Sequence, residues 1–291
     1  MGELYALLTA VMWAAAVIFL KRSGETIPPF ALNFFRVAVS TACMVLTIVV
    51  AGQQVWYGAP LKDYLTLFAS GVIAIAISDT LFLMALNRVG AGIMAIVDCL
   101  YAPSVVLFAF ILLGERLGAW QWVGMALVIV GVLIAARHEP PHGKTARQIL
   151  IGSGYGFLSM ATVALGIVIA KPVLNRSPIL WATAMREIGA LIVMIPAALI
   201  APNRRAVFGL FRPARNWKFS VPGTLLGSYL ALIFWIAGMK YSMAGPAAIL
   251  NQTSSIYVLI FASIFLKEPF TVRKVIASVL AIAGIVMVTL A

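Results

Sequence analysis

Charged side chains are scarce in this sequence, and acidic ones are the scarcest. Only 9 of the 291 residues are Asp or Glu, and all charged residues together make up 10% of the chain, whereas 63% of it is hydrophobic. A soluble domain usually has about a quarter of its residues charged. Together with a mean hydropathy of +1.05, this composition excludes an ordinary soluble domain and indicates an integral membrane protein.

Cysteine and histidine are equally rare, with 2 of each. Cys43 and Cys99 lie inside apolar runs without redox or metal-binding spacing, so we expect small buried side chains. The histidines, His138 and His142, match the H-E-x-x-H pattern of zinc enzymes in letters only. That chemistry needs both imidazoles on one face of a helix, and the intervening Pro140 and Pro141 prevent such a helix. We therefore expect no metal site, no cofactor and no enzymatic activity.

The alternating strand patterns of a membrane β-barrel are also missing. Instead the chain consists of runs of roughly 18 to 22 mostly apolar residues, the length that a helix needs to cross a bilayer of about 30 Å. The sequence predicts an all-α membrane fold of ten transmembrane helices, at 4–20, 30–51, 65–85, 91–112, 119–136, 149–170, 179–200, 219–239, 246–266 and 273–290.

The net charge of +12 would point to nucleic acid in a soluble protein. Here the basic residues sit almost entirely between the apolar runs, where they act as topology signals and contact lipid headgroups. We therefore predict a multi-pass protein of the inner (plasma) membrane, surrounded by lipid and without a nucleic-acid partner.

The chain is doubled. A shift of 153 positions lays residues 91–117 on 244–270 and matches Asp98 with Asn251, and a shift of 150 matches Arg36 with Arg186. The repeat is five helices long, and since five is odd, the second copy must cross the membrane in the opposite sense. We predict two inverted repeats, 1–137 and 149–291, joined by a linker at 138–148.

Several of these motifs resemble a known family. Trp13 and Lys21 on the first span, the entry from Pro28 to Arg36, the segment 91–116 with Pro103 and Gly114-Glu115-Arg116, and the Gly124/Gly131 helix are similar to the EamA-type repeat of the drug/metabolite transporter superfamily. The resemblance covers the chain twice and is greatest to ten-helix bacterial exporters such as the YddG-type exporters of aromatic and other amino acids. It implies the fold and transport, but not the substrate.

The direction of insertion stays open from the sequence. The odd-numbered connections carry far more Lys and Arg than the even-numbered ones, which by the positive-inside rule leaves both termini outside. The family resemblance implies termini in the cytoplasm.

Ionisable residues inside the predicted spans are candidates for a substrate or proton path, because buried charges in membranes pair or mark such paths. On ideal helices, Asp79 shares a face with Gly71, and Asp98 shares one with Tyr101. Arg36 and Arg186 are the matching cations. A structural alternative is that these charges form buried ion pairs that fix helix packing.

Polar and aromatic residues complete the predicted site. Asn251, Gln252 and Ser254 lie in the polar half of their span, and Trp13 and Tyr101 could stack on a substrate. We expect nine substrate-binding residues around a cavity between the two repeats: Trp13, Arg36, Asp79, Asp98, Tyr101, Arg186, Asn251, Gln252 and Ser254.

These features predict a secondary transporter that exports small metabolites, amino acids above all, by alternating access around a central cavity. It would act as a monomer, with protons as a possible coupling partner. The alternatives left open are a drug or other metabolite exporter, a facilitator indifferent to a proton gradient, and a receptor or scaffold that transports nothing.

Overall fold

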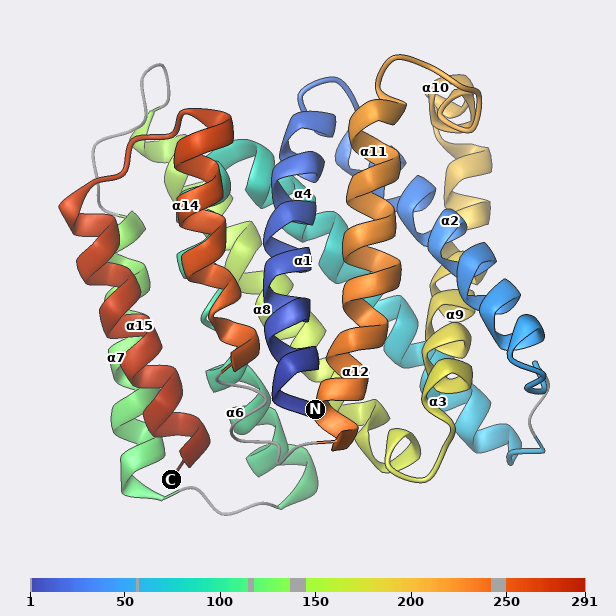
Figure 1. Cartoon of the computed structure of the whole chain (residues 1–291), viewed down its shortest axis with the longest axis horizontal. Helices are drawn as coiled ribbons and strands as arrows, with labels where there is room; N and C mark the ends of the chain where they lie inside the picture. Colours follow the sequence, from blue (N-terminus) through green and yellow to red (C-terminus); the bar gives the residue numbers. More distant parts are fainter. Residues whose placement is uncertain (1, 56–57, 115–117, 137–144, 242–249, 291) are drawn as a thin grey trace.

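The structure is a computed structural model that describes residues 2–55, 58–114, 118–136, 145–241 and 250–290. Every regular element in these ranges is helical, and no strand occurs in them. The helices stand roughly side by side, and both termini lie toward the same end of the bundle (Figure 1). The all-helical prediction is confirmed for this part of the chain. The H-E-x-x-H segment and most of the predicted linker lie outside the described residues.

The helices follow one another in two series. The first series is α1 (Gly2–Ser23), α2 (Pro29–Val50), α3 (Leu61–Gly71), the π-helix η1 (Val72–Ile77), α4 (Ser78–Val89), α5 (Ala91–Asp98), α6 (Tyr101–Leu113) and α7 (Ala119–Ala136). The second is α8 (Ala146–Leu174), α9 (Ile179–Ile200), α10 (Arg204–Gly209), α11 (Trp217–Thr224), the π-helix η2 (Leu225–Leu230), α12 (Ala231–Tyr241), α14 (Ser254–Leu266) and α15 (Val272–Leu290).

Within the described ranges, six helices are long and apolar enough to cross a membrane: Leu4–Ser23, Pro29–Val50, Leu61–Val89, Ala91–Leu113, Ala146–Leu174 and Ile179–Ile200. Each coincides with a span predicted from the sequence. Two shorter apolar helices, Ala119–Ala135 and Leu250–Leu266, coincide with two more. The protein is therefore a multi-pass membrane protein.

Two proline residues set matching helix starts. Pro28 immediately precedes α2, and Pro178, 150 positions later, immediately precedes α9. Proline lacks a backbone N–H and has a fixed φ, which suits the start of a helix, where the first N–H groups have no partner within the helix. The residues that matched in the sequence thus begin corresponding helices.

The span from α3 to α4 departs from the ideal helix used for the sequence prediction. Its central turn is the π-helix η1, where the side-chain amide of Asn33 donates to the carbonyl oxygens of Ile75 and Ala76, at 2.9 and 3.4 Å. A π-turn holds an extra residue, so it rotates the faces on either side of it. Gly71 therefore packs directly against the carbonyl oxygen of Arg186, and the prediction that it shares a face with Asp79 toward the cavity was wrong.

The predicted helix at 91–112 is broken in its middle. α5 ends at Asp98, and α6 begins at Tyr101. Pro103 explains the break, because it has no N–H to donate to the carbonyl of Cys99 and its ring crowds that carbonyl. Asp98 and Tyr101 thus lie on either side of this irregular turn, and both line the cavity described below.

α7 and α15 pack closely at one side of the bundle (Figure 1). A Cβ added at Gly124 would lie 2.6 Å from the carbonyl oxygen of Gly284, and one at Gly131 would lie 2.7 Å from that of Ala277. Only glycine permits this approach of two helix backbones. The Gly124/Gly131 pattern therefore serves packing between two helices of the same chain.

Candidate functional site

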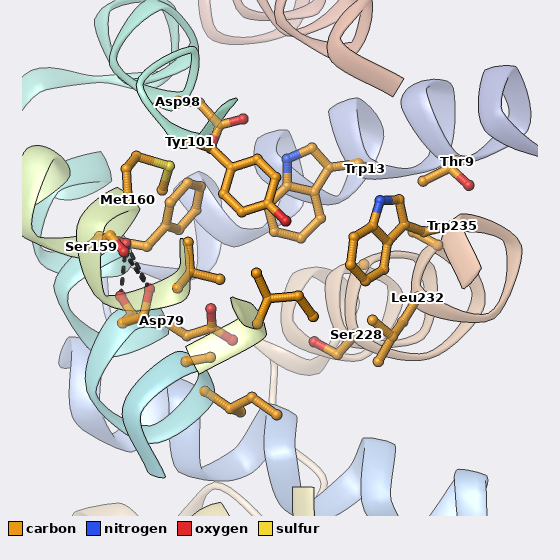
Figure 2. Close-up of a pocket in the computed structure, with 18 of the residues that line it drawn as sticks. Thr9, Trp13, Asp79, Asp98, Tyr101, Ser159, Met160, Ser228, Leu232 and Trp235 are labelled. Atoms are coloured by element: carbon orange, nitrogen blue, oxygen red, sulfur yellow. Dashed lines mark hydrogen bonds between the residues drawn. The ribbon is translucent and has the colours of Figure 1, made fainter. Parts of the chain in front are cut away.

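A cavity of about 220 Å³ lies in the middle of the bundle. Its walls come from α1, α2, η1 and α4, the break between α5 and α6, α8, α9, η2 and α12, and the start of α14 (Figure 2). Among the described residues, none of α7 or α15 lines it. All nine residues predicted from the sequence lie on its wall: Trp13, Arg36, Asp79, Asp98, Tyr101, Arg186, Asn251, Gln252 and Ser254. Whether they contact a substrate stays a prediction.

Arg36 crosses from α2 to the second half of the chain. Its Nε donates to Oγ of Ser228 on η2 at 3.0 Å, and its Nη2 forms a 3.5 Å ion pair with Oδ2 of Asp79 on α4. The guanidinium is buried, while the Asp79 side chain keeps 26% exposure. Arg36 therefore holds Asp79 at the cavity wall and joins η2 to the first half.

Arg186 makes the corresponding contact in the reverse direction. From α9 its Nε donates to Oγ of Ser70 on α3 at 3.0 Å, and Ser70 donates in turn to the carbonyl of Gly166 at 2.7 Å. An arginine guanidinium is planar and holds several N–H donors in fixed positions, so it can bind a hydroxyl and a carboxylate at the same time. Each matching arginine thus bonds to a serine on the π-helix-containing span of the other half.

Glu187, next to Arg186, is a cavity residue that the sequence prediction left out of the site. Its Oε1 accepts a hydrogen bond from Oγ of Ser40 at 2.6 Å, and the Ser40 Oγ also lies 2.8 Å from the carbonyl oxygen of Ser228. Glu187 lies inside the predicted span 179–200, where a carboxylate needs a partner. No sequence signal identified Ser40 as that partner, because the contact spans 147 positions.

Asp98 differs from the other carboxylates of the cavity, since in the described part of the chain no hydrogen bond or ion pair engages it. Figure 2 places its carboxylate close to the rings of Trp13 and Tyr101, with Trp235 across the opening. Trp13 also packs against Phe82, with ring centroids 5.7 Å apart. An unpaired carboxylate beside aromatic faces is an arrangement that attracts an ammonium group.

Three other polar atoms of the cavity are buried and without a hydrogen-bond partner among the described residues. They are Nη1 of Arg36, Oε2 of Glu187 and Nε2 of Gln252. Buried polar atoms are nearly always bonded in proteins, so each unpaired one needs an explanation. The residues of the cavity wall thus include two buried donors and one buried acceptor without a partner.

Two serines on the cavity wall join α4 to α8 by hydrogen bonds. Ser78 on α4 and Ser159 on α8 each donate to the other's carbonyl oxygen, at 2.8 and 2.9 Å, with their Oγ atoms 3.1 Å apart (Figure 2). Ser159, Ser228 and Trp235 line the cavity and were not predicted as site residues. A lone serine in an apolar run gives no sign of what faces it.

The irregular turns around the cavity are repeated. The π-helix η1 begins at Val72 and η2 begins at Leu225, 153 positions later. The break after Asp98 also recurs near Asn251, where the N–H and Oγ1 of Thr253 both donate to the carbonyl of Leu250. No proline causes this second break, so different residues produce the same irregularity.

Polar contacts tie together the helix ends that lie opposite the chain termini (Figure 1). The carboxylate of Glu268 accepts from the N–H groups of Ala91 and Gly92 at 2.8 and 2.9 Å and so caps α5. A negative charge at a helix N-terminus is favourable. Arg22, at the end of α1, donates to the carbonyl of Phe265 at the end of α14, at 2.9 Å.

Apolar helices around a polar, charged cavity are the architecture of a multi-pass membrane protein. The sequence matches the EamA-like transporter family over residues 1–137 and again over 150–290, and the chain belongs to this family.

Its relatives include an uncharacterized transporter of Archaeoglobus fulgidus, 22% identical over 97% of this chain and 96% of the relative. A second uncharacterized transporter of that organism is 24% identical over 99% of this chain and 97% of the relative. Protein PecM of Dickeya dadantii is 22% identical over 76% of this chain and 72% of its own length. A crystal structure of another protein, 17% identical, superposes with a TM-score of 0.68 over 99% of this chain and 96% of the other, which shows the shared fold alone.

Proposed function

We propose that the protein is a secondary transporter that exports small metabolites, chiefly amino acids, across the inner (plasma) membrane. The observation that carries this proposal is the division of charge in the cavity. Asp98 is an unpaired carboxylate beside aromatic rings, whereas Arg36 keeps an unpaired, buried Nη1. An amino acid is a zwitterion and can pair with both residues. Its ammonium group binds the carboxylate of Asp98, and its carboxylate binds the guanidinium of Arg36.

The repeated irregularities support an inverted-repeat mechanism. Transporters of that architecture bind substrate where helices are discontinuous, near the interface of the two repeats. Here two π-turns and two helix breaks, each pair separated by 153 positions, surround the cavity. We propose ten transmembrane helices in two inverted repeats, 1–137 and 149–291.

The contacts at the end opposite the termini support alternating access. Glu268 caps α5 and Arg22 binds the end of α14, so these helix ends are held together by a few polar bonds that a rearrangement can break. We propose that they form a gate that opens when the cavity faces that side. The cavity is formed within one chain, which supports function as a monomer.

Transport in proteoliposomes tests this proposal. The purified chain is reconstituted, and uptake of labelled amino acids, organic cations and other metabolites is measured with and without a pH gradient. Uptake of amino acids above that of empty liposomes is expected. Uptake of hydrophobic organic cations alone favours a drug exporter, amino-acid transport indifferent to the gradient favours a facilitator, and no uptake of any compound rejects transport.

A further inference from the structure

Five basic residues gather between the end of α9 and the first turn of α11, in a segment that the proposed function does not use. Residues 203–218 contain Arg204, Arg205, Arg212, Arg215 and Lys218 and no acidic residue, and all five are exposed. The segment follows directly on the apolar span that ends at Ile200. It therefore lies where the membrane surface begins.

Several basic residues elsewhere at this end of the bundle are engaged by the protein, whereas Arg147 and Lys267 are exposed. Lys21 binds the carbonyl of Asn87, Arg22 binds Glu25 and the carbonyl of Phe265, and Lys274 binds Glu268. The guanidinium groups of the four arginines of 203–218, in contrast, make no hydrogen bond, ion pair or ring contact in the described part of the chain. Their positive charge is uncompensated.

The segment is held in a fixed shape. Trp217 donates its Nε1 to the carbonyl of Leu210 at 2.7 Å, and Val207 of α10 is fully buried. Phe211 packs edge-on against Phe34 of α2, with ring centroids 5.7 Å apart, yet it remains 37% exposed. A rigid basic surface with half-exposed rings at the end of a span is suited to a membrane interface, where aromatic rings sit at headgroup level.

We infer that residues 203–218 bind the headgroups of acidic phospholipids in the surrounding leaflet. Arginine suits this role because its planar fork bonds a phosphate through two parallel N–H groups. An anionic leaflet attracts basic residues near its surface by about fivefold in association for each residue. This inference does not depend on what the cavity transports.

Native mass spectrometry of the full chain tests whether residues 203–218 bind acidic phospholipids. The protein is extracted from nanodiscs that mix phosphatidylglycerol with phosphatidylcholine, and the lipids that it retains are counted. Preferential retention of phosphatidylglycerol is expected, and an Arg212→Gln/Arg215→Gln variant should retain it at least fivefold less well. The control variant Lys62→Gln/Arg147→Gln removes the same charge from exposed positions outside the segment and should retain it as the wild type does.

Three outcomes would overturn the inference. They are equal retention of the two lipids by the wild-type chain, equal loss in the two variants, and displacement of phosphatidylglycerol by inorganic phosphate, which would indicate a site for free phosphate. Thermal unfolding of both variants in detergent checks that they fold. If Arg212→Gln/Arg215→Gln does not fold, Arg204→Gln/Arg205→Gln is measured in its place, with the same expectation.

Discussion

The Nε of Arg36 donates a hydrogen bond to the Oγ of Ser228 across 192 positions of sequence, at 3.0 Å. The matching Arg186 makes a bond of the same length to Ser70, in the opposite direction between the halves. Two arginines that correspond in the sequence thus connect each half of the chain to the π-helix-containing span of the other half. A movement of one half against the other must strain or exchange these bonds.

Arg36→Gln should lower stability and transport together. It leaves Asp79 without its cation, and removal of one partner of a buried pair costs roughly 3 kcal/mol. The double variant Arg36→Gln/Asp79→Asn removes both charges and should recover most of the stability without recovering transport. Thermal unfolding and proteoliposome uptake separate the two effects. Recovery of transport in the double variant would show that the pair only fixes helix packing.

Asp98→Asn should abolish transport or uncouple it from a pH gradient. Asparagine keeps the shape and hydrogen-bonding capacity of the residue, but it neither carries a charge for an ammonium group nor exchanges a proton. Asn251 shows that an amide is accepted at the matching position in the second half.

The swapped variant Asp98→Asn/Asn251→Asp is the matched control, because it keeps the charge of the cavity and moves it to the other half. We expect it to remain inactive, because a carboxylate at position 251 has different neighbouring residues from one at position 98. A folded Asp98→Asn protein with the wild-type rate and pH dependence would leave Asp79 as the acidic candidate of the first half.

Glu268→Gln should loosen the end of the bundle opposite the termini. Hydrogen bonds to a charged acceptor contribute about 1.5 to 3 kcal/mol, and the substitution also removes the 3.8 Å pairing with Lys274. Faster hydrogen exchange at Ala91 and Gly92 is the expected result. Glu25→Gln is the control, because its exposed ion pair with Arg22 contributes less than about 1 kcal/mol. Equal exchange in the two variants would argue against a gate.

Gly124→Ala should destabilise the protein by about 1 to 3 kcal/mol, because the new Cβ meets the backbone of α15 and forces the helices apart. Gly154→Ala is the matched control, since a Cβ at Gly154 meets nothing within 4 Å. There the loss of a helical glycine should stabilise the protein by about 0.5 to 1 kcal/mol. Thermal unfolding in detergent measures both. A stable Gly124→Ala protein would contradict the close packing of α7 and α15.

The sequence predicted what depends on composition and on matching residues. Apolar runs marked helices, and the match of Arg36 with Arg186 and of Asp98 with Asn251 marked residues that the structure brings to one cavity. Such residues are visible because a charge inside an apolar run is expensive and therefore conspicuous.

The sequence did not predict what depends on local geometry or on partners far along the chain. An ideal helix was assumed where η1 turns Gly71 away from the cavity. Ser228 gave no signal because a serine in a membrane span can simply bond to its own helix, whereas here its Oγ accepts from Arg36. Pro103 was noted, but the break that it causes between Asp98 and Tyr101 was not.

Accessibility of Ser254 to water tests the central cavity most directly. Ser254 is a buried residue on the cavity wall, and a Ser254→Cys variant is made after Cys43 and Cys99 are replaced by alanine. The variant is reconstituted and treated with a membrane-impermeant thiol reagent, with and without a transported amino acid. We predict that the cysteine reacts and that the amino acid slows the reaction. A cysteine that never reacts, or one whose reaction no transported compound changes, would contradict a substrate path through this cavity.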